Sequence, residues 1–448
     1  MEIKGKNITI LGAERSGIAA AKLAVQNGAN VFVSDLSNNE SVNKNCEELK
    51  KLNIDFELGG HTNKVYNCDL LITSPGIPSN AGVLKTAAEK GIKIISEIEF
   101  ASWFCKGEII AITGTNGKTT TTTLIAYVVN NGGKKCYTAG NIGLPFSEVV
   151  MNVKPDEYVA LEVSSFQLDF IDEFKPKYSI VLNITPDHLD RYEDRFDLYI
   201  KSKMRITENQ NGEDVFIYNG DDPNLPVGLV PEGVRLYPFS IDKGLRYGSF
   251  VDEDWIVFNE NYETTEICNV KDLALKGEHN LQNSLAAINV AMNIGIDVDS
   301  IKKGLSNFRG VEHRLEFVRE INGVKFINDS KATNVDAVWY ALRSFDKPIF
   351  LILGGKDKGN DYSKIKDEVK NRVKKIYAIG SSAEKVFNYF KTVTDTEIIE
   401  NFEDAITKGL AEASNGEYVL LSPACASFDM FKNYEDRGQQ FKNIVNQL

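Results

Sequence analysis

Residues 108–123 constrain the fold of this chain more than any other stretch. The apolar, β-branched run 109–112 leads into the loop Gly114–Thr119, and a helical pattern follows. A strand, a glycine loop and a helix in this order are typical of a phosphate-binding loop, whose backbone N–H groups and helix N-terminus attract phosphate oxygens. Lys118 can reach the β- and γ-phosphates, and the hydroxyl of Thr119 can hold Mg²⁺. A Gly- and Thr-rich turn is the plainer alternative, but both flanks favour the phosphate loop.

The loop departs from the usual G-x-x-x-x-G-K-[ST] pattern, because Ile112 occupies the position of its first glycine. The shorter core still predicts a nucleoside triphosphate site. Its expected ATP-binding residues are Gly114, Thr115, Asn116, Gly117, Lys118, Thr119 and Thr120.

Length and charge narrow the classes of protein that this chain can belong to. A chain of 448 residues suggests about three domains. A net charge of −12 disfavours a nucleic-acid partner. The six cysteines contain no C-x-x-C pair, which is typical of reduced thiols in a cytosolic protein. No signal peptide or membrane-length apolar run is visible, so we expect a cytoplasmic protein without membrane insertion. We also expect a monomer.

The first hundred residues have the pattern of a nucleotide-binding half of a doubly wound sheet. Residues 7–36 alternate strand, turn, helix and strand, with the turn at Gly12–Gly17. Glu14 replaces the second glycine of G-x-G-x-x-G, which disfavours NAD but leaves open a nucleotide held differently, or no ligand. A second turn, Ser74–Gly76, follows a buried strand and should lie at the same sheet edge. A domain boundary is expected near residue 97.

Polar residues after the strands of the second segment are candidate metal ligands. Glu162 lies near the end of the strand pattern 158–163, where a carboxylate in a phosphate-loop domain suits Mg²⁺, although a lone strand glutamate is often structural. His188 follows the next strand beside two acids, and we favour a second metal position there over a simple polar residue. The helical pattern 196–208 carries Lys203, for which a solvated face is the plain alternative.

The remaining central residues predict a small, partly antiparallel side sheet over 212–270, followed by a helix. His279, Asn280 and Asn283 gather at the start of that helix. They suit nucleotide contacts, and helix capping by Asn280 is the compatible alternative.

From Val311 onward, strands again end in polar loops, as in a parallel sheet with one ligand-binding edge. Lysines and hydroxyls in these loops suit an acidic small substrate and a polyphosphate. They are Lys331, Thr333, Lys358 and Ser427.

Taken together and in order, these motifs resemble the Mur ligase family of peptidoglycan synthesis over nearly the whole chain. The residues that carry the resemblance are Gly114–Thr119, Glu162–Gln167, Asn183–Asp190, Gly277–Asn280, His313–Arg314 and Asp329–Asn334. The stretch Leu421–Phe431 with Arg437–Gly438, and the turns Gly12–Gly17 and Ser74–Gly76, resemble the branch of the family that adds D-glutamate.

The resemblance implies an α/β fold of three domains. Rossmann-like, doubly wound sheets over 1–96 and 311–448 would flank a central P-loop ATPase-type domain, 97–310, with its small side sheet. It implies ATP-dependent addition of D-glutamate to UDP-N-acetylmuramoyl-L-alanine through an acyl phosphate, with two Mg²⁺ ions and no covalent organic cofactor.

The resemblance also implies roles for single residues. Lys118, Glu162, His188 and Lys203 would form the catalytic set, and Thr119, Glu162, His188 and a carbamylated Lys203 would bind the metals. Further ATP contacts would come from Asn280, Arg314, Asp329 and Lys331. The UDP-substrate would contact Ser16, Asp35, Ser74, Gly76, Asn141 and Ser164. D-Glutamate would contact Thr333, Lys358, Ser427, Phe428 and Tyr434. Arg15 and Tyr434 depart from common family residues, which puts substrate affinity in question.

Two other classes compete with this interpretation. A folylpolyglutamate-synthetase-like ligase would share the central and C-terminal patterns, but the nucleotide-binding pattern before the phosphate loop argues against it. A non-catalytic nucleotide switch would keep the phosphate loop without needing Glu162, His188, Lys203 and Lys331 together.

Overall fold

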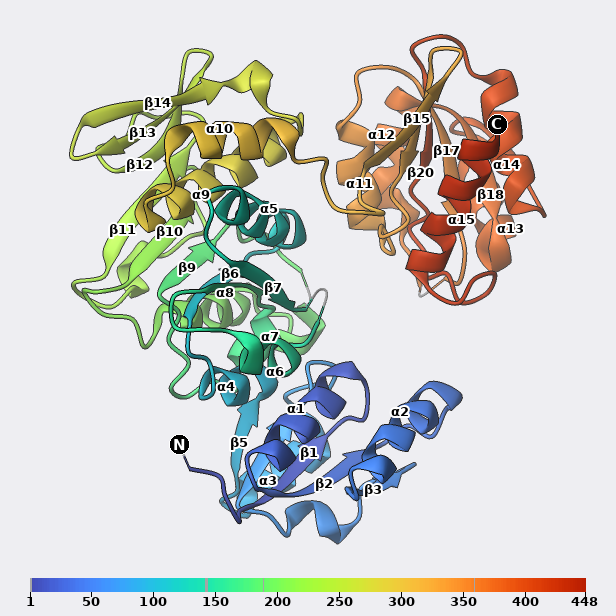
Figure 1. Cartoon of the computed structure of the whole chain (residues 1–448). Coiled ribbons are helices and arrows are strands. Elements are labelled where there is room, and N and C mark those ends of the chain that lie inside the picture. Colours follow the sequence, from blue (N-terminus) through green and yellow to red (C-terminus); the bar gives the residue numbers. More distant parts are fainter. Residues whose placement is uncertain (1, 142–143, 188, 358) are drawn as a thin grey trace. The chain divides into compact units, whose positions relative to one another are not determined.

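The structure is a computed structural model that describes residues 2–141, 144–187, 189–357 and 359–448 (Figure 1). The chain separates into two compact units, Met1–Phe308 and Arg309–Leu448. Within the described residues the first unit contains a five-stranded and a nine-stranded sheet, and the second unit contains a six-stranded sheet.

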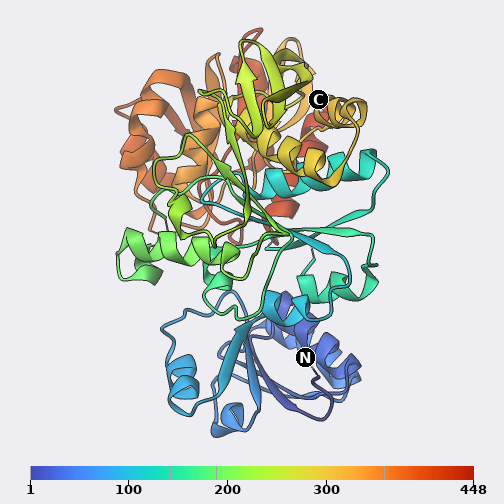
Figure 2. The ribbon, with the colours of Figure 1, turned by 90° about the vertical axis from the view of Figure 1, so that its left-hand side faces the viewer.

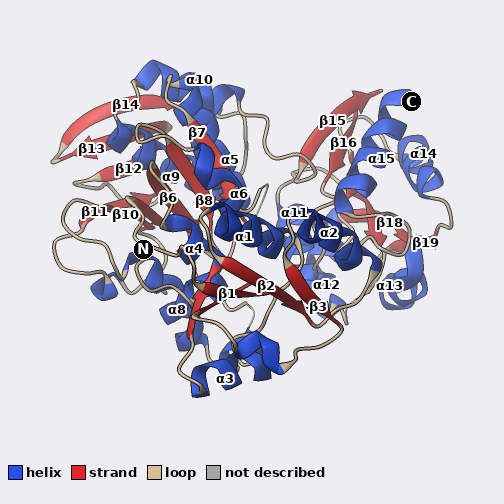
Figure 3. Ribbon diagram, turned by 60° about the horizontal axis from the view of Figure 1, so that its bottom comes forward, coloured by secondary structure: helices blue, strands red, loops and turns tan. Residues whose placement is uncertain are grey.

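The N-terminal sheet is parallel and doubly wound, with the strand order β3-β2-β1-β4-β5. Figure 3 shows α1 and α2 on one side of its strands and α3 on the other. Its elements are β1 (Asn7–Leu11), α1 (Arg15–Gln26), β2 (Asn30–Asp35), α2 (Glu40–Lys51), β3 (Asp55–Leu58), β4 (Leu70–Thr73), α3 (Gly82–Glu89) and β5 (Lys93–Ser96).

Side chains of this sheet alternate between two apolar layers, as strand geometry requires. Ile8 and Ile10 of β1 belong to the layer under α1, whereas Leu11 packs with Leu84 of α3. Both faces are covered, which is why all four residues of β4, an interior strand, are buried.

The nine-stranded sheet has the order β14-β13-β12-β11-β10-β9-β6-β8-β7. Helices α5, α9 and α10 pack together on one side of it, and α7 packs against α8. Its elements are α4 (Glu97–Ser102), β6 (Glu108–Thr113), α5 (Lys118–Asn131), β7 (Cys136–Gly140), α6 (Phe146–Val149), β8 (Tyr158–Glu162), α7 (Ser165–Leu168), β9 (Tyr178–Val181), α8 (Phe196–Met204), β10 (Val215–Asn219), β11 (Arg235–Ser240), β12 (Gly248–Asp252), β13 (Trp255–Glu260), β14 (Glu263–Asn269), α9 (Glu278–Ile294) and α10 (Val298–Asn307).

The strands over 212–270 do not form the separate side sheet expected from their turn-rich sequence. Strand β10 pairs in parallel with β9, and β11 to β14 continue the same ladder, with antiparallel pairing only at β12–β13–β14. In Figure 2 the yellow-green hairpin strands continue from the green strands of the central sheet. Val215 and Ile217 are fully buried, so β10 is an interior strand of this sheet.

The second unit is a six-stranded sheet with the order β15-β16-β20-β17-β18-β19, antiparallel only at β15. Leu351 and Leu353 of β17 face one apolar layer with α11 and α13, and Phe350 and Ile352 face another with α14 and α15. Its elements are β15 (Glu316–Ile321), β16 (Val324–Asn328), α11 (Val335–Arg343), β17 (Ile349–Gly354), α12 (Lys366–Arg372), β18 (Val373–Ile379), α13 (Ala383–Phe390), β19 (Asp395–Ile398), α14 (Phe402–Glu412), β20 (Tyr418–Leu421) and α15 (Tyr434–Gln447).

The α/β class, with doubly wound sheets in the N-terminal and C-terminal parts of the chain and a phosphate-loop sheet in the part between them in sequence, is therefore confirmed. Among the described residues, no helix combines the length and the apolar character that a membrane crossing demands.

Candidate functional site

The phosphate loop joins β6 to α5 through two glycines with positive φ. Gly114 has φ 148° and Gly117 has φ 84°, and Gly117 is the N-cap of α5. A Cβ on Gly117 would lie 2.5 Å from Oδ1 of Asn283 on α9. Only glycine fits this position without a shift, because both the backbone conformation and the space exclude a side chain.

Lys118 curls back over this loop. Its Nζ donates to the carbonyl oxygens of Gly114 at 2.8 Å and Thr115 at 2.9 Å. A flexible ammonium held by two carbonyls at a helix N-terminus can turn toward a phosphate, whose negative charge is the stronger acceptor.

Strand β8 places a buried carboxylate beside the first turn of α5. The Thr119 hydroxyl donates to Oε2 of Glu162 at 2.8 Å, and Asn141 Nδ2 donates to Oε1 of Glu162 at 3.3 Å. Glu162 is 2% exposed. Strands β6 and β8 are neighbours in register, with Ile112 beside Glu162, so the sheet itself aligns the loop with this carboxylate.

The loop after β9 locks the phosphate loop from its other side. Asn183 accepts from Asn116 N at 2.8 Å through Oδ1, and its Nδ2 donates to Asn116 O at 3.1 Å. The Thr115 hydroxyl donates to Thr185 O and accepts from Thr185 N, both at 3.0 Å. Sequence reasoning quoted Asn183 as part of a motif but did not give it this positioning role.

Lys203 does not lie on a solvated face. Its side chain is 2% exposed, and Nζ donates to Gly114 O at 2.9 Å and lies 4.6 Å from the centre of the Tyr199 ring. Burial, followed by the positive charge of Lys118, lowers the pKa of Lys203 well below its usual range. Lys201, two residues earlier, is exposed. Tyr199 was missed because an aromatic residue on an amphipathic helix gives no signal beyond core packing.

The donor set around Glu162 suits a hard cation. A carboxylate, a threonine hydroxyl and an amide are the oxygen-rich ligands that Mg²⁺ prefers. His188 lies outside the described residues. Within the described residues no group of three or more His, Cys, Asp or Glu side chains has metal-binding geometry.

Helix α9 begins beside the phosphate loop, and Gly277 rather than Asn280 is its N-cap. Gly277 has φ 95°, a conformation that suits glycine better than asparagine. Asn280 lies in the first turn, where its Nδ2 donates to Lys276 O at 2.8 Å and its Oδ1 accepts from Asn283 Nδ2 at 3.4 Å.

The N-terminal sheet gathers its predicted substrate residues at the carboxyl ends of β1, β2 and β4. A Cβ on Gly12 would lie 2.6 Å from Ser74 Oγ, so the two turns touch. Both carboxylate oxygens of Asp35 accept backbone N–H groups, from Ala13 and Ser37, each at 2.7 Å. Among the other predicted residues here, Ser16 is half-buried in the first turn of α1 and Gly76 is exposed. Ser164 is buried, and its N–H donates to Gln167 Oε1 at 2.9 Å.

In the second unit the loop after β16 holds a buried carboxyl. Asp329 is 4% exposed, and it accepts from Ser422 Oγ at 2.7 Å and Leu315 N at 3.2 Å. Burial raises the pKa of Asp329 to about 7, despite the opposing hydrogen bond from Ser422 and the charge of Arg314. Lys331 Nζ lies 5.8 Å from the centre of the Tyr434 ring.

A buried arginine, Arg437, fastens two predicted ligand loops of this unit to each other. It is 1% exposed and donates to Ser330 Oγ at 2.9 Å, Ser330 O at 2.7 Å and Cys425 O at 3.2 Å. The sequence identified Arg437 only as part of a family motif. Its structural role was missed because a single buried residue in the polar first turn of a helix leaves no periodic pattern.

The predicted amino-acid contacts differ in exposure. Ser427 is buried, Phe428 is 64% exposed and Thr333 is half-buried. Lys358 lies outside the described residues. Lys356 N donates to Ala426 O at 2.8 Å, which brings the loop after β17 beside the loop after β20.

Three family models match successive parts of the chain. They are the MurD N-terminal domain over residues 7–83, the Mur ligase middle domain over 112–291, and the Mur ligase, glutamate ligase domain over 313–425.

Similar proteins cover the whole chain. A UDP-N-acetylmuramoylalanine--D-glutamate ligase of Christiangramia forsetii is 45% identical over 99% of this chain and 100% of its own length. A protein of the same name from Salinibacter ruber is 43% identical over 100% of this chain and 99% of its own.

Among solved structures, UDP-N-acetylmuramate-alanine ligase MurC of Thermotoga maritima has a TM-score of 0.60 at 19% identity, covering 99% of each chain. That likeness concerns the fold, whereas the sequence relatives and the three successive family models concern the lineage. The chain therefore belongs to the Mur ligase family.

Proposed function

We propose that this Mur ligase adds D-glutamate to UDP-N-acetylmuramoyl-L-alanine, forming ADP and phosphate during cytoplasmic synthesis of peptidoglycan precursors. The full-length relatives that bear this enzyme's name, at 43% and 45% identity, support the choice of substrates. The enzyme uses ATP and two Mg²⁺ ions and works as a monomer.

The reaction has two steps that balance without a further reactant. A carboxylate oxygen of UDP-N-acetylmuramoyl-L-alanine attacks the γ-phosphorus of ATP, giving an acyl phosphate and ADP. The amine of D-glutamate then attacks the acyl carbon, loses a proton and expels phosphate. The contribution of the protein is positioning and stabilisation of negative charge.

The phosphate loop performs the first of these tasks. The N–H groups at the start of α5 and the ammonium of Lys118 bind the β- and γ-phosphates. Thr119 and Glu162 would hold Mg²⁺, which supplies neutralisation of the charge that grows on the phosphate oxygens. The single observation that carries the proposed ATP and Mg²⁺ chemistry is the 2.8 Å hydrogen bond between Thr119 and Glu162 at the start of α5.

Lys203 would act as a carbamate. Its lowered pKa leaves a share of neutral amine, whose nitrogen attacks the carbon of CO₂ and releases a proton, giving an anionic oxygen ligand. His188 is the proposed partner at the second metal.

The substrates would bind at three sets of residues. The UDP-substrate would bind Ser16, Asp35, Ser74, Gly76, Asn141 and Ser164. The nucleotide would also contact Thr115, Asn116, Thr120, Asn280, Arg314, Asp329 and Lys331. D-Glutamate would bind Thr333, Lys358, Ser427, Phe428 and Tyr434. We propose functional domains at 1–96, 97–310 and 311–448.

A phosphate-release assay tests the proposal. Purified protein, ATP, Mg²⁺ and UDP-N-acetylmuramoyl-L-alanine are mixed with one amino acid at a time. We expect release with D-glutamate and none with L-glutamate, L-lysine or diaminopimelate. Release that depends on another amino acid would reassign the enzyme within its family, and release without any amino acid would refute ligase activity.

A further inference from the structure

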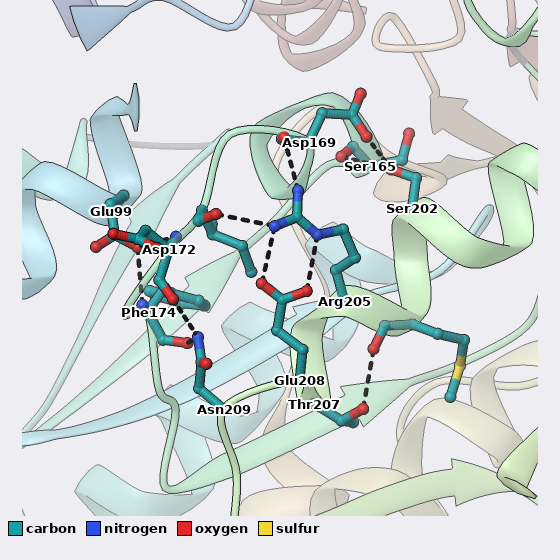
Figure 4. A network of polar contacts seen from close by, with 12 residues as sticks. Glu99, Ser165, Asp169, Asp172, Phe174, Ser202, Arg205, Thr207, Glu208 and Asn209 are labelled. Carbon is teal, nitrogen blue, oxygen red and sulfur yellow. Dashed lines mark hydrogen bonds and ion pairs between the residues drawn. The ribbon is translucent and has the colours of Figure 1, made fainter. Parts of the chain in front are cut away.

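Residues 169–174, between α7 and β9, form a segment without helix or strand that is fastened on two sides. Figure 4 shows the polar contacts that converge on it. Its backbone groups bond to Glu99 of α4 on one side and, on the other, to Arg205 of the 3-10 helix Arg205–Thr207 and to Asn209 just beyond it.

On the first side, one buried carboxylate collects three backbone N–H groups. Glu99 of α4 is 0% exposed, and its Oε2 accepts from Asp172 N at 2.9 Å and Phe174 N at 2.8 Å. Glu173 N donates to both carboxylate oxygens of Glu99, at 3.1 and 3.2 Å. A carboxylate that accepts several N–H groups holds them firmly, because each bond is assisted by its charge.

Helix α4 is in turn a direct continuation of the N-terminal sheet. Strand β5 ends at Ser96 and α4 starts at Glu97, with no residue between them. Ser96 N donates to Phe170 O at 2.8 Å, and Lys93 forms an ion pair with Asp172. The segment is thus bonded to the last strand of that sheet as well as to α4.

On the second side, Arg205 and Asn209 bind the carbonyl groups of the same segment. Arg205 donates to Asp169 O at 2.6 Å and Ile171 O at 2.9 Å, and its guanidinium is held in place by Glu208 at 2.8 Å. Asn209 Nδ2 donates to Asp172 O at 2.9 Å and Phe174 O at 3.1 Å.

The third contact lies beside Lys203 itself. Ser202 Oγ is 2.6 Å from Asp169 Oδ1 and 2.9 Å from Ser165 O, and the Tyr192 hydroxyl donates to Asp169 Oδ2 at 3.1 Å. Ser202 and Lys203 are adjacent, so the bond that fixes Ser202 also fixes the rotation of α8 that directs Lys203 toward Gly114.

We propose that segment 169–174 couples the position of the N-terminal sheet to that of Lys203, with Glu99, Arg205 and Asn209 as positioning residues. The inference rests on the proposed function for its catalytic consequence, but not for the coupling itself. When the N-terminal sheet shifts, α4 carries Glu99 with it, the segment follows, and α8 loses the contacts that hold its last turn.

Hydrogen exchange of the full-length chain tests the coupling without any assay of activity. Glu99→Gln removes the charge and replaces one of the two acceptor oxygens, which bind the segment and Trp103 Nε1, by an NH₂ group, so the bonds that hold the segment weaken. We expect amides 200–204 of α8 to exchange about tenfold faster or more than in the wild type.

Glu97→Gln is the matched control. Glu97 is also a buried carboxylate of α4, but it accepts from Ser147 N at 2.6 Å and so binds α6 instead of the segment. We expect it to leave exchange at 200–204 unchanged. Equal rates in the two variants, whether fast or slow, would overturn the proposal.

A second pair of variants keeps the test decisive if Glu99→Gln does not fold. Asn209→Ala removes two bonds to the segment, whereas Asn130→Ala removes similar bonds to Ala126 O at 2.6 Å and Cys136 O at 2.8 Å, away from it. Only the first should speed exchange at 200–204.

Kinetics then test the consequence for Lys203. Asn209→Ala should raise the Mg²⁺ concentration needed for half-maximal rate about tenfold, with the KM for D-glutamate unchanged. An increase in that KM with unchanged Mg²⁺ dependence would contradict a role through Lys203. Absence of D-glutamate-dependent turnover in the wild type would refute the proposed function, and the exchange result would still decide the coupling.

Discussion

The hydroxyl of Thr119 donates to the carboxylate of Glu162, so that the first turn of α5 and the end of β8 present oxygen atoms to one point. Replacing Glu162 by glutamine keeps the shape and removes the charge. We expect kcat/KM to fall by about 10²–10³ and the Mg²⁺ requirement to rise, because a preorganised charge partner of the phosphates is lost.

Steady-state rates measured over a series of Mg²⁺ concentrations check this expectation. Glu157→Gln is the control, since that carboxylate precedes β8 and accepts from Lys154 N at 2.9 Å. Unchanged Mg²⁺ dependence in Glu162→Gln would remove Glu162 from the metal site.

Lys203 should be essential because its proposed carbamate supplies an anionic oxygen, and a small carboxylic acid can supply the same group. We expect Lys203→Ala to be nearly inactive and to regain part of its rate when a short carboxylic acid is added, since the acid can supply the missing anionic oxygen. Lys201→Ala, two residues away on an exposed position, should behave like the wild type. Full activity of Lys203→Ala without the acid would sink the carbamate assignment.

Replacement by alanine should be tolerated less well at Gly117, before α5, than at Gly133, just after the same helix. Gly117→Ala places a Cβ at φ 84° and 2.5 Å from Asn283 Oδ1, whereas Gly133, at φ 78°, has nothing within 4 Å. Gly133→Ala should cost about 1–2 kcal/mol for its backbone alone. Gly117→Ala should cost more and weaken ATP binding, as measured by chemical unfolding and nucleotide titration. Equal costs would show that Asn283 moves aside freely.

Asp329 should make stability fall as pH rises. Its folded pKa is raised from 3.8 to about 7, so the folded state keeps a proton that the unfolded state has already lost. The stabilisation is complete below about pH 4 and disappears as pH rises through about 7. Unfolding free energy should drop by about 1.4 kcal/mol per pH unit inside this window, or about 4 kcal/mol in all.

Asp329→Asn should remove this dependence. Relative to the wild type, its unfolding free energy should improve between pH 4 and pH 7 and level off above that range, while activity falls because a proposed nucleotide contact is changed. Asp361→Asn in the same unit offers the opposite sign, because hydrogen bonds from Ser363 lower the pKa of Asp361. A difference between Asp329→Asn and the wild type that stays constant with pH would contradict the raised pKa.

Long apolar runs in the sequence predicted the interior strands correctly, whereas the short, turn-rich strands over 212–270 did not indicate which strands they pair with. Apolar runs such as 349–354 located the interior strands, because both faces of a parallel strand are buried. The turn-rich stretch 212–270 suggested a small side sheet. Its first strand, β10, pairs with β9, but the 33 residues 182–214 separate the end of β9 from the start of β10, and no local sequence pattern indicates this pairing.

The same distinction applies to the candidate site. Motif residues such as Lys118 and Thr119 follow from a local pattern, and their roles stay predictions. The burial of Lys203 and the contacts of Asn183 could not be foreseen, because both depend on distant segments meeting Gly114 and Asn116.

The continuous nine-stranded ladder also has a practical consequence for engineering. Its far edge is the hairpin β13–β14, whose turn at Asn261 and Tyr262 has positive φ at both residues, with Tyr262 70% exposed. Three strands, β12, β11 and β10, stand between this hairpin and β9 in the sheet order. A fluorescent domain or an affinity peptide inserted at this turn would extend a surface turn at the edge of the sheet. It would leave the conformation of the phosphate loop unchanged.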